Sequence, residues 1–256
     1  MASILWGAKS GFSELFMTET WAGVAEFIGQ LLGRGTELTP AFLDFVSWRD
    51  ALWLSLDTIG MSVLAIGFAA LAVLFTFLPA ARNVAFGEFS GSRSALGGVG
   101  FCFMRGVFLF TRGVPELSRA MLIVFVFSPG ILPGAIALGL HNYGILGKLS
   151  AEVVEDLDPR PARALRTAGA SNLQMPLYGV LPQVLPQSLS YTLYRWEVVI
   201  RTTIVVGFVA ARGLGREFRL GMSFFRYDKV MLLLMCYLLL VLGVDLIAAW
   251  LMRLVR

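Results

Sequence analysis

The chain has few charged side chains and few of the residues from which metal or catalytic sites are built. Charged residues make up 15% of the 256 positions, against roughly 25% in soluble domains. The single histidine, His141, cannot form a metal site and is interpreted as an interfacial structural residue at the end of a span. Cys102 and Cys236 lie far apart in apolar surroundings, which favours small core residues over a disulfide.

Motifs of the common enzyme classes are also missing. The sequence contains no GxxxxGK[ST] phosphate loop, no HExxH motif, no CxxC pair and no GxSxG nucleophile turn. We therefore predict that the chain is not an enzyme, holds no metal or cofactor and does not hydrolyse ATP by phosphate-loop chemistry. The energy for its work then has to come from a partner.

Apolar sequence is what the chain has in excess. Hydrophobic residues make up 57% of it and the mean hydropathy is +0.75, which indicates a bilayer environment. A spanning helix needs about 20 mainly apolar residues. We predict an all-α integral membrane protein, a helical bundle of about five spans. The spans are expected at residues 58–81, at 120–147 as two helices that turn at Ser128-Pro129-Gly130, at 191–211 and at 230–252.

Residues 1–50 are predicted to form a separate N-terminal segment ahead of a transmembrane domain over 51–256. Apolar residues from Phe12 to Leu32 recur at helical spacing, with acidic residues between them. The pattern is typical of an amphipathic helix that either lies on the membrane surface or packs on the spans. The segment holds no uncharged run long enough to span a bilayer.

The basic residues set an expected orientation. With residues 52–79 running from outside to inside, residues 80–119 and 148–186 lie inside. The loop over 212–229 then lies outside, where its basic residues either form a solvated surface or attract an anionic solute or an acidic partner. These residues are Arg212, Arg216, Arg219, Arg226 and Lys229.

Residues 163–186 carry the strongest functional pattern. Gly169 permits a sharp turn and close approach of a partner backbone, and Pro182 and Pro186 are expected to end or kink the following helix. This spacing resembles the EAA loop of ABC importer permeases. The resemblance implies a cytoplasmic helix-turn-helix, over about residues 150–186, that docks into an ATPase subunit. The residues implied in coupling are Arg163, Ala164, Leu165, Gly169, Ala170, Leu181 and Pro182.

Two positions depart from the pattern of that loop. Arg163 stands where the family has an acidic residue, and Gly179 replaces the apolar residue before the Leu-Pro pair. A salt link from an acid at this site is therefore not expected.

Further segments resemble the permeases of phosphonate ABC importers in particular, and the match covers about residues 50–256. In the family's glycine-rich segment, alanines and Arg212 replace glycines here, which suits one half of a pair of different permeases. The matching segments are 112–116 (RGVPE), 141–152 (HNYGILGKLSAE), 178–186 (YGVLPQVLP), 190–197 (SYTLYRWE), Arg201 and 205–215.

This resemblance implies the core of a type I ABC importer permease in the bacterial cytoplasmic (inner) membrane, moving phosphonate by alternating access. Its implied partners are two ABC ATPase subunits that bind ATP and Mg²⁺, a second permease copy or a paralogous permease, and a soluble substrate-binding protein, with no nucleic acid. Phosphite, hypophosphite or another small anion is the alternative cargo. An ATPase-independent channel or an integral membrane enzyme is the alternative from another class.

Three ionisable residues near a predicted span are candidates for the translocation path, because such residues are costly in a membrane. Glu197 and Arg201 are four positions apart with the acid first, which favours a structural salt bridge. Arg195 has no partner by spacing and is the better candidate for binding an anion, whose oxygens a guanidinium matches in pairs. Asp57 and Asp245 are interpreted as boundary or helix-contact residues.

A helix start is predicted at Arg112-Gly-Val-Pro115-Glu116, since Pro115 suits a first turn and Glu116 complements the positive helix end. The resemblance implies that Arg112, Pro115 and Glu116 lie around the cytoplasmic gate. A capped helix without such a role is the alternative.

Overall fold

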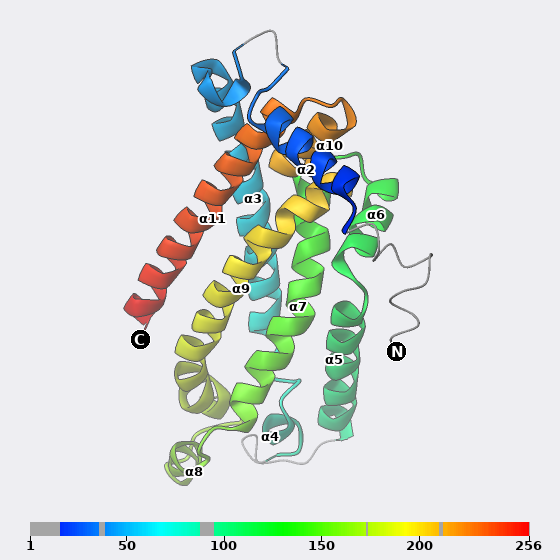
Figure 1. The fold of residues 1–256 in the computed structure, drawn as a ribbon. Helices are drawn as coiled ribbons and strands as arrows, with labels where there is room; N and C mark the ends of the chain where they lie inside the picture. The colour runs from blue at the N-terminus through cyan, green and yellow to red at the C-terminus, as the bar shows by residue number, and fades with distance from the viewer. Residues whose placement is uncertain (1–15, 36–38, 88–94, 173, 210–211, 256) are drawn as a thin grey trace.

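The computed structural model describes residues 16–35, 39–87, 95–172, 174–209 and 212–255, and every regular element within them is helical. Figure 1 shows the helices in one elongated bundle. In chain order they are α2 (Thr18–Leu31), η2 (Ala41–Leu43), α3 (Phe45–Thr76), α4 (Arg82–Ala85), α5 (Ala95–Gly113), α6 (Glu116–Val126), α7 (Ile131–Glu155), α8 (Arg160–Thr167), η3 (Met175–Val180), α9 (Leu181–Val209), α10 (Leu214–Ser223) and α11 (Tyr227–Val255).

The long helices α3, α5, α7, α9 and α11 run alternately up and down the bundle (Figure 1). We call the end that holds α4 and α8 the α8 end, and the end that holds η2, α6 and α10 the α10 end. Among the described helices, α3, α5 and α11 are long and apolar enough to cross a membrane, and a bent element of η3, α9 and α10 adds a fourth candidate.

The sequence placed one span wrongly. The turn at residues 128–130 is confirmed, since α6 ends at Val126 and α7 begins at Ile131. However, α6 has 11 residues and stays at the α10 end, whereas α5, 19 residues long, is the helix able to cross. The prediction failed because α5 is rich in glycine and contains Arg105, and both features resemble a loop until the tertiary contacts are known. Residues 80–119 therefore do not all lie on one side.

Helix α7 is the centre of the bundle and packs against α3, α5, α6 and α9. Its glycines allow this, because side chains there would overlap neighbouring helices. A Cβ added at Gly139 would lie 2.9 Å from the Ala65 carbonyl oxygen of α3, and one at Gly144 would lie 2.7 Å from the Phe108 carbonyl oxygen of α5. Phe108 also meets Tyr143 edge to face, with ring centroids 5.2 Å apart.

The outer surfaces of α3, α5 and α11 carry exposed large apolar side chains, as expected where lipid or a partner helix replaces water. Cys236 is buried, but Cys102 is exposed on α5, so the expectation of two core cysteines holds for one of them. Examples of the exposed residues are Leu71, Phe75, Leu109, Phe110, Leu246 and Trp250.

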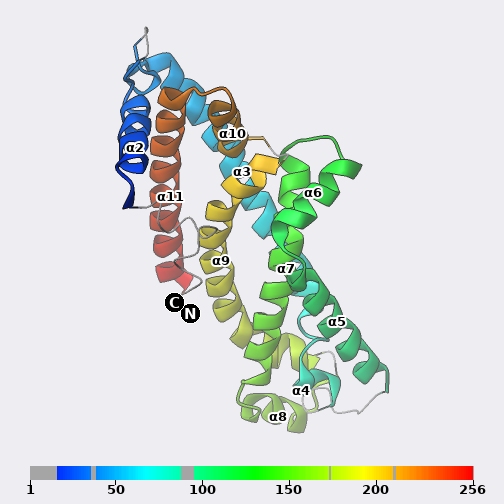
Figure 2. The same cartoon turned by 45° about the vertical axis from the view of Figure 1, so that its right-hand side comes forward.

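Helix α2 lies beside α11 (Figure 2), in agreement with the helix expected from the N-terminal periodicity. The ring of Phe27 meets Tyr227 of α11 at 5.2 Å between centroids. Trp21, Ile28 and Leu32 remain exposed. The helix therefore uses one edge for packing on the bundle, and its position at the membrane surface stays a prediction. Phe12 lies outside the described residues.

Candidate functional site: a coupling element and a polar cluster

The turn after α8 is built by glycine, as the sequence predicted. Gly169 has φ +89°, a left-handed conformation that side chains with a Cβ rarely adopt. The Gly169 amide donates to the Arg166 carbonyl at 3.0 Å, and the Ala170 amide donates to the Leu165 carbonyl at 3.1 Å. This pair of bonds is a Schellman motif, which satisfies carbonyl groups at the helix end and stops α8 sharply.

The next helix begins with a reciprocal cap. The Ser171 amide donates to Gln174 Oε1 at 2.9 Å, and the Gln174 amide donates to Ser171 Oγ at 3.3 Å. Such a capping box fixes the start of the element that continues through η3 into α9. The turn between α8 and η3 is thus closed at both ends by local hydrogen bonds, which makes it a defined helix-turn-helix.

Gly179 explains one departure from the family pattern. It is buried in η3, where a Cβ would lie 3.0 Å from Leu165 Cδ1 and 3.5 Å from Ala162 Cα of α8. The missing side chain leaves room for α8 to lie against η3. An apolar residue at this position would have to displace Leu165 or move α8 outward.

Pro182 and Pro186 do not end the following helix, which was one of the two effects expected of them. Helix α9 runs from Leu181 to Val209 with Pro182 in its first turn and Pro186 inside it. Immediately before them, Met175–Val180 adopts a π-helix. A first-turn proline loses no intrahelical hydrogen bond, and the Gln183 side-chain amide donates to the Gly179 carbonyl. The π-helix over Met175–Val180 therefore lets the chain continue into α9 despite Pro182.

The proposed coupling residues lie together at the α8 end. Gly169 and Pro182 are exposed, while Leu165, Ala170 and Leu181 are half-buried and join α8 to η3. Arg163 and Ala164 are exposed on α8 itself, together with Arg160 and Arg166. A docking partner could thus reach the exposed residues without unpacking the turn. Their role in coupling stays a prediction.

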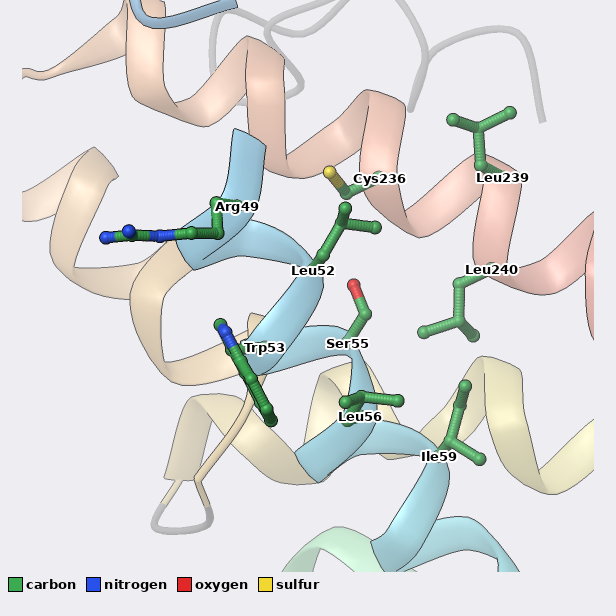
Figure 3. A pocket seen from close by; sticks show the side chains of 9 residues that line it. All are labelled: Arg49, Leu52, Trp53, Ser55, Leu56, Ile59, Cys236, Leu239 and Leu240. Carbon is green, nitrogen blue, oxygen red and sulfur yellow. The ribbon is translucent and has the colours of Figure 1, made fainter. Parts of the chain in front are cut away.

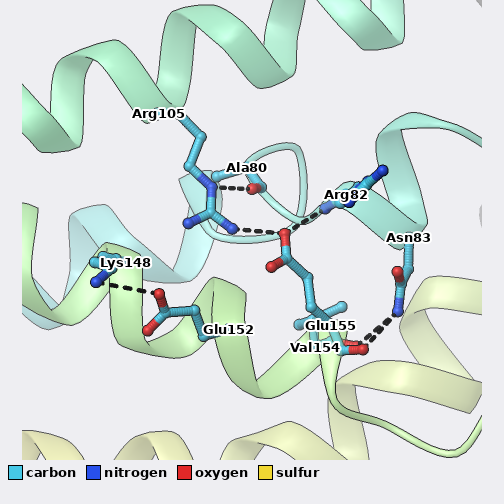
Figure 4. A network of polar contacts seen from close by, with 8 residues as sticks. All are labelled: Ala80, Arg82, Asn83, Arg105, Lys148, Glu152, Val154 and Glu155. Carbon is cyan, nitrogen blue, oxygen red and sulfur yellow. Dashed lines mark hydrogen bonds and ion pairs between the residues drawn. The ribbon is translucent and has the colours of Figure 1, made fainter.

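A network that the sequence did not reveal anchors the stem of this element (Figure 4). Glu155, the last residue of α7, accepts from Arg105 Nη2 of α5 at 2.5 Å and from the Arg82 amide of α4 at 2.8 Å. Arg105 Nε donates to the Ala80 carbonyl at 2.9 Å, and Asn83 donates to the Glu155 carbonyl at 2.9 Å. Four segments are thereby joined just before α8.

The pairing of Arg105 with Glu155 spans 50 positions, so no local spacing could have predicted it. Lys148 and Glu152 follow the span that was expected to end at residue 147, but in the structure they belong to the last turns of α7. Their ion pair of 3.2 Å is 38% and 41% exposed. Helix packing decides this difference, because α7 continues to Glu155 along α5 and α3.

Arg195 lies on α9 and is held by α7. Its Nε and Nη2 atoms donate to Asn142 Oδ1 at 2.9 and 2.7 Å. Asn142 is fully buried and donates in turn to the Leu138 carbonyl at 2.8 Å. The expectation of an unpartnered arginine is therefore corrected: Arg195 has a neutral amide partner, so its positive charge is oriented but not neutralised by this contact.

A second arginine lies near this one. Arg119 of α6 is 6% exposed, and its Nη2 atom donates to the Thr111 carbonyl and, at 2.9 Å, to the Val114 carbonyl. Glu116 lies close enough to Arg119 and Arg195 for their charges to interact. We call Glu116, Arg119, His141, Asn142 and Arg195 the polar cluster.

His141 belongs to the polar cluster and not to the end of a span. It lies in the first half of α7, and its ring interacts with the charges of Arg119 and Arg195. Sequence reasoning misplaced it because it treated residues 120–147 as a hairpin that ends near this point. Among the described residues there is no group of three or more His, Cys, Asp or Glu side chains that could hold a metal ion.

The expected Glu197–Arg201 pair is replaced by a contact between helices. Arg201 Nη2 of α9 lies 2.7 Å from Asp245 Oδ2 of α11. Asp245 is thus a helix-contact residue, as expected, and Asp57 lies 3.8 Å from Arg212. Two crossing helices can bring opposite charges closer together than the i,i+4 spacing within one helix does. Arg201 therefore pairs with Asp245 of α11 and not with Glu197 of its own helix.

The proposed gate residues lie where α5 meets α6, at the far end of α5 from α4 and α8, and their role in a gate stays a prediction. Arg112 is in the last turn of α5, Pro115 precedes α6 as its N-cap, and Glu116 is the first residue of α6. The predicted helix start is therefore present, without a side-chain cap hydrogen bond. Figure 2 shows α5 rising from the α8 end and α6 continuing toward the α10 end, so these residues lie between the two ends.

The glycines that remain near residues 206–215 serve close packing. A Cβ at Gly207 of α9 would lie 2.9 Å from the Gly215 Cα of α10. Gly213 has φ +91°, and the following Leu214 amide donates to Thr58 Oγ1 of α3 at 3.0 Å. Gly207 and Gly213 therefore allow α9, α10 and α3 to pack closely. Residues 210–211 lie outside the described part of the chain.

An apolar groove of about 420 Å³ opens between α3 and α11 (Figure 3). Leu52 and Ser55 of α3 face Cys236 and Leu240 of α11. Arg49 is the one charged residue of its lining, and it pairs with Asp50 at 3.4 Å. The groove suits an apolar occupant and lacks the charge that an anion requires.

Comparison with known proteins agrees with this architecture. A phosphite transport system permease, PtxC of Stutzerimonas stutzeri, is 36% identical over 211 residues, 82% of this chain and 72% of that protein. The phosphate-import permease PhnE of Mycolicibacterium smegmatis is 32% identical over 195 residues, 76% of this chain and 35% of that protein. The putative cryptic phosphonate permease PhnE2 of Escherichia coli is 49% identical over 80 residues, 31% of this chain and 66% of that protein.

Solved structures show the same fold. An amino acid ABC transporter gives a TM-score of 0.61 at 19% identity, covering 82% of this chain and 98% of that chain. An inward-facing MetNI methionine ABC transporter gives 0.62 at 15% identity, covering 81% of this chain and 98% of that chain. At these identities the likeness concerns the fold alone.

A family model described as the inner membrane component of binding-protein-dependent transport systems matches residues 83–256. The chain is thus a multi-pass inner membrane protein and a transport subunit, not an enzyme, that works with a substrate-binding protein and a separate ATPase. Helices capable of spanning, the helix-turn-helix at the α8 end and the sequence matches all lead to one conclusion: the chain belongs to the family of binding-protein-dependent ABC importer permeases.

Proposed function

We propose that this permease imports a phosphorus oxyanion, phosphite or a phosphonate, by alternating access. The observation that carries the proposal is its 36% identity to a phosphite permease over 82% of the chain. The polar cluster is compatible with such a cargo, because Arg119 and Arg195 supply two positive charges in apolar surroundings against the single carboxylate of Glu116. Phosphate is a second candidate, favoured by the 32% identity to a phosphate-import permease.

The proposed assembly contains two permease chains, two ATPases that hold ATP and Mg²⁺, and one binding protein. The second permease is another copy of this chain or a paralogue. Nucleotide-driven motion enters at α8 and η3 and moves α7 and α9, the helices that flank this element. Because α7 and α9 also carry His141, Asn142 and Arg195, the same two helices connect the docking turn with the polar cluster.

The charge of α8 indicates the chemistry of its docking partner. Arg160, Arg163 and Arg166 are exposed on this short helix, and its first turn contains no acidic residue. Exposed basic residues attract an acidic surface, and Arg160 already has an acid nearby, Asp158 at 3.7 Å. We propose that the ATPase cleft that receives α8 is acidic, so that an arginine replaces the family's acid at Arg163.

The direct test is to purify the chain with its ATPase, reconstitute both in proteoliposomes and supply the binding protein. We expect ATP-dependent uptake of phosphite or methylphosphonate in preference to phosphate, and native mass spectrometry is expected to show equal numbers of permease and ATPase chains. Preferential uptake of phosphate would favour the second candidate. Uptake that persists without ATP would contradict the importer and favour a channel.

A further inference from the structure

We propose that Arg119, His141 and Arg195 form a binding site inside the permease for a singly protonated phosphorus oxyanion, such as the monoanion of phosphite or of a phosphonate. This inference rests on the proposed function and adds the location of the site and the protonation state of its ligand. It is carried by two buried polar atoms, Arg119 Nη1 and His141 Nδ1, that have no hydrogen-bond partner in the described part of the chain.

Arg119 is fixed in a way that leaves one donor nitrogen unused. Its Nη2 atom serves the carbonyls of Thr111 and Val114 and thereby ties α6 to the end of α5. Its Nη1 atom is buried and has no partner among the described residues, although the residue is 6% exposed. A buried charged donor without a partner is expensive. An anionic oxygen would satisfy it with a charge-assisted hydrogen bond.

His141 offers an acceptor beside this donor. Its ring forms a backbone hydrogen bond with Val114, whose carbonyl also accepts from Arg119. Because Nδ1 has no partner among the described residues, we assign Nε2 as the nitrogen that carries the proton and faces this carbonyl. In the neutral ring Nδ1 then carries a lone pair. A P–OH group can donate to that lone pair, whereas an oxyanion without a proton cannot.

Arg195 completes the site through its charge. Two of its nitrogens share Asn142 Oδ1, which fixes the plane of the guanidinium without neutralising it. With Glu116 ionised and His141 neutral, the polar cluster carries a net charge of about +1, because two arginines face one carboxylate. A monoanion makes the site electrically neutral, whereas a dianion such as sulfate leaves it with excess negative charge.

The experiment uses the purified permease–ATPase complex without its binding protein, with phosphite as the probe and sulfate as the competitor. Binding is followed by ³¹P NMR line broadening, and the KM for uptake is measured separately in proteoliposomes with the binding protein. His141→Phe keeps the ring volume and removes Nδ1. Arg119→Lys keeps the charge and can still reach the carbonyls, but it lacks the second nitrogen. Arg253→Gln, at an exposed arginine near the end of α11, is the matched control.

We expect both cluster variants to weaken phosphite binding and raise the KM by about 10- to 100-fold, the effect of losing one hydrogen bond to a charged group. The control should match the wild type, and excess sulfate should not displace phosphite. The site is refuted if both variants bind and transport phosphite as the wild type does, while the proposed function stands. If sulfate displaces phosphite as readily as phosphite itself does, His141 does not select for a protonated ligand by accepting its hydrogen bond. A wild type that moves no phosphorus oxyanion refutes the proposed function itself.

Discussion

At the α8 end, the carboxylate of Glu155 accepts hydrogen bonds from Arg105 and from the backbone of Arg82. In the polar cluster, Arg119 and His141 each keep a buried polar atom without a partner among the described residues. Both groups lie between helices. Charges that are fully paired hold helices together, whereas incompletely paired donors and acceptors are available for a ligand. We therefore propose that the α8 end transmits motion and that the polar cluster binds the cargo.

Of the proposed variants, a substitution in the docking turn is expected to reduce uptake most. Gly169→Val places a β-branched residue at φ +89°, which costs about 1–2 kcal/mol and opens the Schellman turn. We expect ATP-dependent uptake to fall about tenfold or more, while the amount of protein inserted in the membrane stays unchanged. Gly169→Asn is the control, because asparagine tolerates this conformation. Unchanged uptake by the valine variant would contradict the coupling role.

Arg195→Gln is expected to have the next largest effect. The variant keeps a donor for Asn142 but removes the positive charge from the polar cluster, so the KM for anion uptake should rise about tenfold. Assembly with the ATPase, measured by co-purification, should change little. Arg195→Lys tests geometry against charge, because lysine cannot donate two parallel bonds to one oxygen. Wild-type transport by the glutamine variant would leave Arg195 with a purely structural role.

At the α8 end, Glu155→Gln should lower the free energy of unfolding by about 2 kcal/mol, between the values for buried and exposed pairs. Its ion pair with Arg105 is 25% exposed on both sides. Glu152→Gln, one turn earlier in α7, is the matched control and should cost less than about 1 kcal/mol. Thermal unfolding in detergent measures both. Equal losses would show that the Glu155 network is no stronger than an exposed pair.

The smallest effect is expected for Arg201 and Asp245. The pair is 2.7 Å apart, with side chains 50% and 33% exposed, so its coupling energy should be about 1 kcal/mol or less. A double-mutant cycle with Arg201→Gln and Asp245→Asn measures this value by thermal unfolding. Uptake should keep its wild-type KM in all three variants. A raised KM would place Arg201 in the translocation path, beside Arg195.

Local patterns predicted those parts of the fold and the site that depend on neighbouring residues. The helix starting before Glu116, the turn at residues 128–130 and the left-handed glycine after α8 are all present. Each depends on a backbone preference or on a cap within a few positions. The helix does not end at Pro182 or Pro186, and the π-helix over Met175–Val180 that precedes Pro182 has no comparable local signal in the sequence.

The sequence by itself determined the membrane class, most of the spanning helices and the docking turn, because hydropathy and turn chemistry act over short distances. Only the tertiary structure decided that α5 crosses the bundle, that Arg105 pairs with Glu155, and that Arg119, His141 and Arg195 form one cluster. Those contacts join positions separated by many turns of helix, and they depend on how closely α7 can approach its neighbours. The glycines of α7 permit that approach, and their partners are known only once the helices are packed.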